Sequence, residues 1–133
     1  KRYIGVVLTT PMKASHEDTW KLPLPGRQDE VESNEPYPYQ KCYCSICRKT
    51  SGGEGYTINL SADAKTLKID GEEHLETYRA LLSPDSRQSN HRRRFCRHCG
   101  SHLWAWNNTW PELLHPVAGS VDSALPKTPY YTH

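Results

Sequence analysis

Hydrophobic and polar residues alternate over short stretches of this chain rather than over long ones. The segment YIGVVLT (3–9) is rich in β-branched residues, residues 56–60 alternate, and residues 103–106 form a run dominated by aromatic side chains. Alternation with a period of two, interrupted by turn residues, is typical of β-strands. The pattern predicts a mainly β fold of short antiparallel strands.

The remaining segments are shorter and give weaker patterns. Further strands are expected at residues 28–33, 67–69, 75–78, 93–96 and 117–121. We expect 67–69 and 75–78 to pair with each other through Gly71, and residues 83–90 to form a polar loop. Residues 35–39 are expected to be extended, because proline disfavours helical geometry in the residue before it. The only helical turn expected is at 45–50.

Composition limits the class of protein. The 133 residues suit one domain spanning 1–133, and the ten prolines and eight glycines indicate many turns. No run approaches the roughly 18 apolar residues of a membrane span, and no secretory leader is visible. The 17 basic and 15 acidic residues give a net charge of +2, which predicts neither a nucleic-acid nor a membrane partner.

Three of the five cysteines lie within KCYCSICRKTSGG (41–53). Cys42 and Cys44 are two apart, so on an extended segment both sulfurs point to one side. Cys47 can join them if the chain turns after Cys44. Three thiolates suit tetrahedral Zn²⁺, and three protein ligands leave a fourth position open, as in a catalytic zinc site. We expect zinc at these three residues.

The other two cysteines, Cys96 and Cys99, form a CxxC knuckle followed by Gly100. Such a pair normally needs two more ligands. An odd number of cysteines argues against a secreted disulfide framework, so we expect thiolate chemistry in the cytoplasm. Three alternatives remain: all five cysteines are small buried side chains, Cys96 and Cys99 are a redox pair, or both clusters share one closed structural zinc.

CYCSICRKTSGGEGY, FCRHCGSHLWAW and WPELLHPVAGSVDS together resemble the glutathione-dependent formaldehyde-activating enzyme family, also called GFA or centromere-protein-V-like. The resemblance covers roughly residues 31–123, whereas residues 1–30 are atypical. It implies a single Mss4-like, β-rich domain with zinc-binding loops. Relatives usually continue beyond the position of His133.

The resemblance implies two zinc ions. The first is catalytic, at Cys42, Cys44 and Cys47. The second is structural and uses Cys96 and Cys99 with an earlier CxC motif, but the matching positions 22–24 hold Leu-Pro-Leu. The second site is therefore short of two ligands, and His16 and His98 are the candidates to supply them. Otherwise the two cysteines form a disulfide or stay free.

The activity implied by the resemblance is that of a carbon–sulfur lyase, the S-(hydroxymethyl)glutathione synthase type, which joins glutathione to formaldehyde. Arg48 is a candidate for binding a glutathione carboxylate, because arginine forks suit carboxylates. The run 92–94 is a second candidate for that role, but we expect it to be a solvated strand face. Trp104 and Trp106 are expected to pack in the core. The alternatives are a non-catalytic, zinc-stabilised module that binds a protein or acidic partner, and an enzyme with a different thiol or carbonyl substrate.

Overall fold

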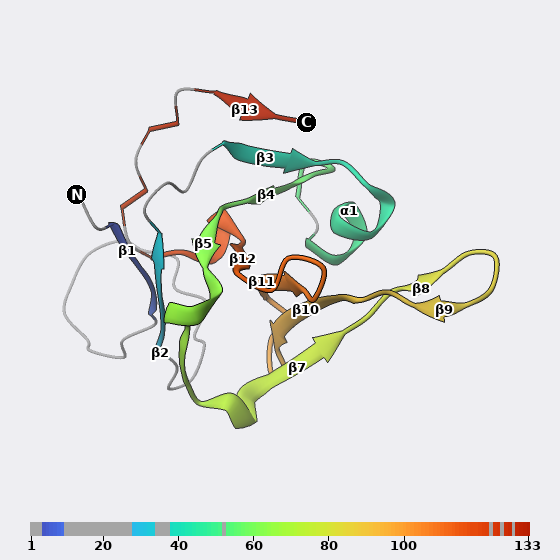
Figure 1. Cartoon of the computed structure of the whole chain (residues 1–133), viewed down its shortest axis with the longest axis horizontal. Coiled ribbons are helices and arrows are strands. Elements are labelled where there is room, and N and C mark those ends of the chain that lie inside the picture. Colours follow the sequence, from blue (N-terminus) through green and yellow to red (C-terminus); the bar gives the residue numbers. More distant parts are fainter. Residues whose placement is uncertain are drawn as a thin grey trace.

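The structure is a computed structural model that describes residues 4–9, 28–33, 38–51, 53–122, 124–125, 127–128 and 130–133. Short strands dominate these residues, and Figure 1 shows them grouped in small sheets around a single α-helix, α1 (Ser45–Ser51). The prediction of a mainly β fold is therefore confirmed. Among the described residues, no helix has the length and apolar character needed to cross a membrane.

A five-stranded sheet forms the centre of the molecule. Its order is β5 (Ala62–Asp63), β12 (Leu113–Pro116), β11 (His102–Asn107), β10 (His91–Cys96) and β7 (Leu75–Tyr78). All neighbours are antiparallel. The middle strand, β11, is buried at four consecutive positions, 102–105, so both of its faces pack in the interior.

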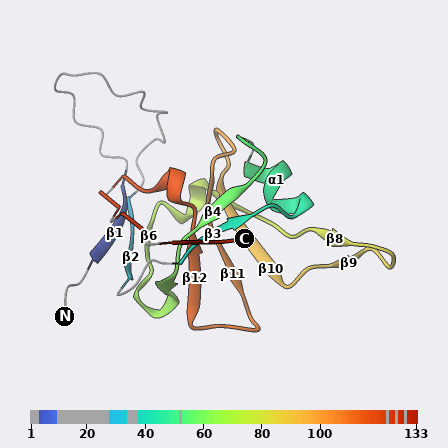
Figure 2. The same cartoon turned by 90° about the horizontal axis from the view of Figure 1, so that it is seen from above.

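Smaller sheets flank the central one. The first contains β1 (Ile4–Thr9), β2 (Gln28–Ser33) and β6 (Lys68–Asp70), the second contains β13 (Tyr131–Thr132), β3 (Tyr39–Cys42) and β4 (Thr57–Asn59), and the third contains β8 (Leu81–Leu82) and β9 (Arg87–Gln88). The β13–β3 pair is parallel, and the others are antiparallel. Figure 2 shows the β8–β9 hairpin projecting from the body of the molecule.

The expected pairing of 67–69 with 75–78 is wrong, although both segments are strands. β6 pairs with β2, whereas β7 pairs with β10 in the central sheet. Between them, Gly71 has a left-handed backbone (φ 86°) and is followed by a 3₁₀ turn, η2 (Glu72–His74). This turn redirects the chain from one sheet to the other instead of folding it back as a hairpin.

Two other local predictions need correction. Residues 83–90 are not all loop, because Arg87–Gln88 pairs with Leu81–Leu82. The strand expected at 117–121 lies earlier, at β12, and a 3₁₀ turn, η3 (Ala118–Ser120), follows it. The Ser120 hydroxyl donates to the carbonyls of Leu103 and Val117, a local bond that competes with extended structure. A further 3₁₀ turn, η1 (Ala64–Thr66), follows β5.

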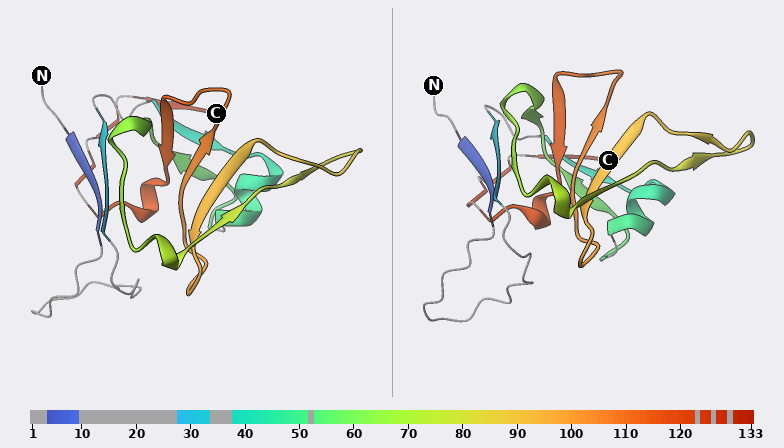
Figure 3. Two further views of the ribbon diagram at one scale, coloured as in Figure 1. Left: turned by 60° about the horizontal axis from the view of Figure 1, so that its bottom comes forward. Right: turned by 90° about the horizontal axis from the view of Figure 1, so that it is seen from below.

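The hydrophobic core lies between the central sheet and β2. Its buried side chains are Val31, Ala62, Leu75, Leu103, Trp104 and Leu114. Trp104 is buried, as predicted, and Trp106 packs partly buried against the same cluster. Figure 3 shows α1 beside β10 and β11, at the opposite end of the molecule from β1 and β2. This placement puts α1 and the segment before it on the framework of the central sheet.

Candidate functional site

The segment between β3 and α1 holds the three clustered cysteines. Cys42 is the last residue of β3 and pairs with Thr57 on β4. Cys44 then caps α1: its carbonyl accepts from the Arg48 N–H at 3.0 Å, and its Sγ accepts from the Cys47 N–H at 3.3 Å. A side-chain acceptor at this position is what an N-cap provides. The turn expected after Cys44 is therefore present, and it brings Cys47 back towards the other two.

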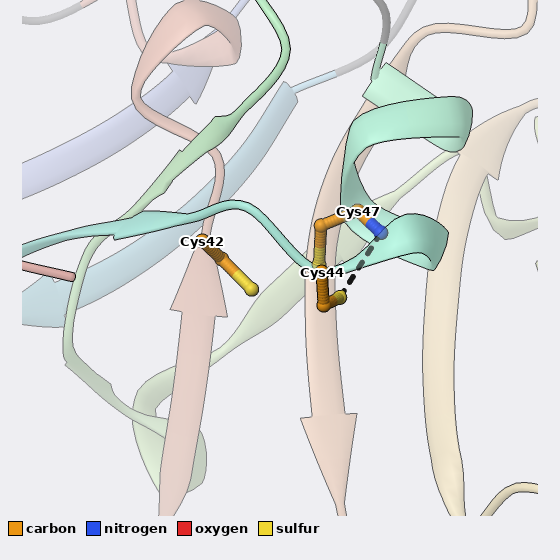
Figure 4. Close-up of side chains that lie close together, drawn as sticks. All are labelled: Cys42, Cys44 and Cys47. Carbon is orange, nitrogen blue, oxygen red and sulfur yellow. Dashed lines mark hydrogen bonds between the residues drawn. The ribbon is translucent and has the colours of Figure 1, made fainter.

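The three sulfur atoms lie together in the structure. The Sγ atoms of Cys42, Cys44 and Cys47 are all within 4.8 Å of one another, and Figure 4 shows the three side chains meeting beside the start of α1. Tetrahedral zinc with Zn–S bonds of about 2.3 Å needs sulfurs about 3.8 Å apart. A small contraction brings the cluster to that spacing, so these residues can hold a metal ion.

The protonation of the thiols differs across the cluster. Burial raises the pKa of Cys47 to about 12, although a hydrogen bond from Arg93 works in the opposite direction. Burial also acts to raise the pKa of Cys44, but hydrogen bonds from the Cys47 backbone and from the Cys42 and Cys47 side chains outweigh it and lower that pKa. Cys44 is exposed, whereas Cys47 is buried. The cluster is thus open to solvent on one side and closed on the other.

Neighbouring residues fix the far end of α1. The Thr57 hydroxyl donates to the Cys47 carbonyl at 3.1 Å, and the Thr50 hydroxyl donates to that of Ile46 at 2.8 Å. After the helix, Gly53 and Gly55 have φ of 70° and 91°, values that other residues rarely adopt. These glycines let the chain reverse into β4 directly after the cysteine segment.

Arg48 is exposed on α1. Its Cδ lies 3.9 Å from where a Cβ on Gly55 would be, so the side chain extends over the turn that follows the helix. Glu54, in the same turn, accepts a hydrogen bond from the Tyr56 hydroxyl at 3.2 Å. Arg48 is therefore an exposed side chain one residue after Cys47, and its role in carboxylate binding stays a prediction.

Aromatic side chains gather on the segment that carries the cluster, and they were not predicted from the sequence. Tyr43, between two of the cysteines, lies 5.2 Å from the Tyr56 ring and 5.7 Å from the His133 ring, measured between centroids. The Lys41 ammonium lies 5.0 Å from the centroid of Tyr56 and 4.5 Å from that of Tyr131. Sequence spacing could have indicated Tyr43, but not the distant Tyr131.

Arg93 was also missed, because the run 92–94 was expected to lie in solvent. Arg93 is 5% exposed, and its Nη2 lies 3.6 Å from the Cys47 sulfur. Arg92 is exposed, and Arg94 is partly buried and bonds Glu72 and Thr77. The prediction of a solvated face therefore fails for the middle residue.

Three histidines lie near this buried arginine, and all stay neutral. Burial, reinforced by the Arg93 charge, lowers the pKa of His91 and of His102 to about 4. Burial also lowers the pKa of His115, whose Nδ1 lies 3.2 Å from the Leu60 carbonyl. His102 is buried, and His91 and His115 are partly buried.

The second cysteine pair differs from the first. Cys96 is fully buried, Cys99 is exposed, and both are free thiols. Burial acts to raise the pKa of Cys99, but hydrogen bonds from Ser101 and Cys96 outweigh burial and lower that pKa. Among the described residues, no third potential ligand joins this pair. His98 instead faces His74 at 3.0 Å, and His16 and positions 22–24 lie outside the described residues.

Known proteins resemble this chain in sequence and in fold. The profile of the family described as "Glutathione-dependent formaldehyde-activating enzyme" matches residues 28–133. A Halomonas elongata protein named "Putative glutathione-dependent formaldehyde-activating enzyme" is 52% identical over 103 residues, 77% of this chain. The match covers 64% of that relative, so the chain spans less than two thirds of its length.

A solved structure supports the same fold. The crystal structure of a Rhodobacter sphaeroides protein superposes with a TM-score of 0.57 and 24% sequence identity. The match covers 75% of this chain and 84% of that protein. At 24% sequence identity, the similarity shows only that the two proteins share a fold.

Proposed function

Because this chain belongs to the family of glutathione-dependent formaldehyde-activating enzymes, we propose that it is a zinc-dependent carbon–sulfur lyase of the S-(hydroxymethyl)glutathione synthase type. It adds glutathione, or a related thiol, to formaldehyde or a small aldehyde. The observation that carries the proposal is the cluster of three sulfurs within 4.8 Å of one another. A non-catalytic module has no need of a three-ligand site with an open edge.

Cys42, Cys44 and Cys47 are the residues that hold the metal in this proposal. When bound there, zinc supplies Lewis acidity that favours the thiolate form of an incoming thiol. In the reaction, a C–S bond forms between sulfur and the aldehyde carbon. The C=O π electrons move onto oxygen, which takes up the proton lost by the thiol. The protein contributes proximity, because thiols and aldehydes already react in water.

Arg48 binds a carboxylate of glutathione in this proposal. It is exposed, one residue after Cys47, and its guanidinium can form two parallel hydrogen bonds to a carboxylate. The substrates are therefore small molecules that reach the cluster from the Cys44 side.

The remaining parts of the proposal concern the whole chain. We treat residues 1–133 as one domain working in the cytoplasm, where thiolate ligands stay reduced. Cys96 and Cys99 stay predicted ligands of a second zinc. Their missing partners would come from residues outside the described part of the chain, such as His16, because His98 faces His74.

Exchange NMR tests the activity directly. The rate of interconversion between free formaldehyde and S-hydroxymethylglutathione is measured with and without the protein, since the uncatalysed reaction sets a background. We expect the wild-type chain to accelerate exchange and Cys44→Ser to abolish the acceleration. Lys49→Ala, an exposed change on the same helix, is the matched control and keeps the acceleration. A wild-type rate equal to background would refute the proposed activity.

A second candidate function rests on a separate groove. A cavity of about 520 Å³ is lined by four basic residues and one acidic one, together with Trp104 and Trp106. The basic residues are Lys65, Arg79, Arg92 and Arg94. This charge suits an acidic partner of a non-catalytic binding module. Retention on heparin that disappears in moderate salt and is lost in Arg92→Ala would favour the module.

A further inference from the structure

The Arg93 guanidinium is a buried cation, and among the described residues its only hydrogen bond is to a sulfur of the cysteine cluster. The side chain is 5% exposed, and Nη2 lies 3.6 Å from the Cys47 Sγ. Its Nε and Nη1 atoms are buried and have no hydrogen-bond partner among the described residues. None of the ion pairs found within the described residues involves Arg93.

Strand register explains why this arginine alone is directed towards α1. Arg93 pairs with Ala105 across the β10–β11 ladder, whereas Arg92 pairs with Trp106 and Arg94 with Trp104. Paired residues share a face of the sheet, and successive residues alternate faces. Arg92 and Arg94 therefore lie on the tryptophan face, and Arg93 lies on the opposite face with α1.

Physical chemistry requires an anion beside this group. A guanidinium stays charged at any pH a folded protein meets, and burying it without a counter-charge costs several kcal/mol. The neighbouring side chains that could titrate, His91 and His102, are neutral and offer no negative charge. The sulfur cluster can supply it: one divalent cation and three thiolates have a net charge of −1.

We propose that Arg93 is a positioning residue that serves as the counter-ion of the metal site at Cys42, Cys44 and Cys47. The inference rests on the proposed function, because it needs a metal at that site. Arg93 brings the loaded site to a net charge of zero and so raises its affinity for zinc. Its N–H donation to Cys47 also withdraws electron density from that sulfur, which leaves the bound metal a stronger Lewis acid.

Zinc affinity provides the first test. The dissociation constants of Arg93→Met, Arg93→Lys and the wild type are measured by competition with a chromophoric chelator at one pH. Loss of a residue that supports a metal ligand typically weakens metal binding about 10- to 100-fold, so we expect Arg93→Met to fall in that range. Arg93→Lys, which keeps the charge, should lie between it and wild type. Arg92→Met, one residue away on the other face, should stay within about twofold of wild type.

A spectrum separates electrostatic support from simple loss of structure. In the cobalt-substituted protein, the sulfur-to-cobalt charge-transfer band reports the donor strength of the thiolates. Removing the N–H donor should move this band to lower energy in Arg93→Met, and Arg92→Met should leave it in place. If circular dichroism shows that Arg93→Met does not fold, the cobalt band of Arg93→Lys is measured in its place.

The outcomes distinguish the inference from the function it rests on. A wild-type chain that binds no zinc would overturn both. A wild type that binds zinc and catalyses exchange, with Arg93→Met or Arg93→Lys unchanged in affinity and in the cobalt band, would overturn the role of Arg93 alone.

Discussion

The His102 imidazole on β11 shares a 3.0 Å hydrogen bond with the Ser51 hydroxyl at the end of α1. The two residues are 51 positions apart, so the bond fastens the helix that follows the cysteine cluster to the central sheet. His102 is buried and lies near the Arg93 charge, and both effects disfavour its protonation. The junction between helix and sheet therefore depends on a neutral histidine.

Stability should consequently fall on acidification. The pKa of His102 is about 4 in the folded protein, against an ordinary value near 6.5, so between these values only the unfolded chain binds the proton. The free energy of unfolding is then constant above about pH 6.5 and decreases towards pH 4, by up to about 3 kcal/mol from this residue. Urea titrations at a series of pH values measure the decrease.

His102→Asn removes the titrating ring and keeps a group able to bond Ser51. We expect the free energy of unfolding of His102→Asn to change less with pH over this window than that of the wild type, by the contribution of at most one proton. An unchanged slope in His102→Asn would show that this histidine is not buried in its neutral form.

Gly100→Ala should destabilise the turn after the second cysteine pair. Gly100 has φ 75°, and an added Cβ would meet no atom within 4 Å, so the penalty comes from the backbone alone. A left-handed conformation costs an alanine about 1 kcal/mol. At Gly119 an added Cβ would also meet no atom within 4 Å, and φ is not positive, so Gly119→Ala should change stability by less than about 0.5 kcal/mol. Thermal denaturation of both variants checks the difference; equal melting temperatures would contradict it.

Leu114→Ala should cost much more. Leu114 is 1% exposed and belongs to the core cluster under the central sheet, so its removal leaves a cavity. Comparable changes cost about 2–5 kcal/mol. Leu81→Ala, at a side chain 65% exposed on the β8–β9 hairpin, should stay within about 0.5 kcal/mol of wild type. Chemical denaturation measures both, and similar values would place Leu114 outside the core.

Arg48→Ala should raise the KM for glutathione several-fold and leave zinc content unchanged. The expected loss is that of a charge-assisted hydrogen bond at an exposed site, about 1 kcal/mol. The matched comparison changes the substrate: 2-mercaptoethanol has no carboxylate, so its kinetics should be the same in Arg48→Ala and in the wild type. Equal effects on the two thiols would remove Arg48 from carboxylate binding.

The parts of the structure that follow local rules could be predicted from the sequence. The spacing of Cys42, Cys44 and Cys47 needs only one turn to bring three sulfurs together, and that turn is present. The strands at 28–33 and 75–78 occur at the predicted residues, because alternation and turn residues act over a few positions.

Other features depend on contacts between distant segments. The partners of β6 and β7 were predicted wrongly. A glycine with a left-handed backbone, such as Gly71, can either close a hairpin or redirect the chain to another sheet, so the sequence at this turn does not distinguish the two. The burial of Arg93 could not be foreseen either, because it depends on which face of β10 receives α1. The extent of the domain stays a prediction.

The proposed function depends on three cysteines that hold zinc and leave a position for the thiol. X-ray absorption at the zinc edge tests this most directly, on the chain loaded with one equivalent of zinc, without and with glutathione. We expect three sulfurs at about 2.3 Å and one lighter ligand, changing to four sulfurs when glutathione is added. Four sulfurs before addition, two or fewer, or no change with glutathione would contradict it.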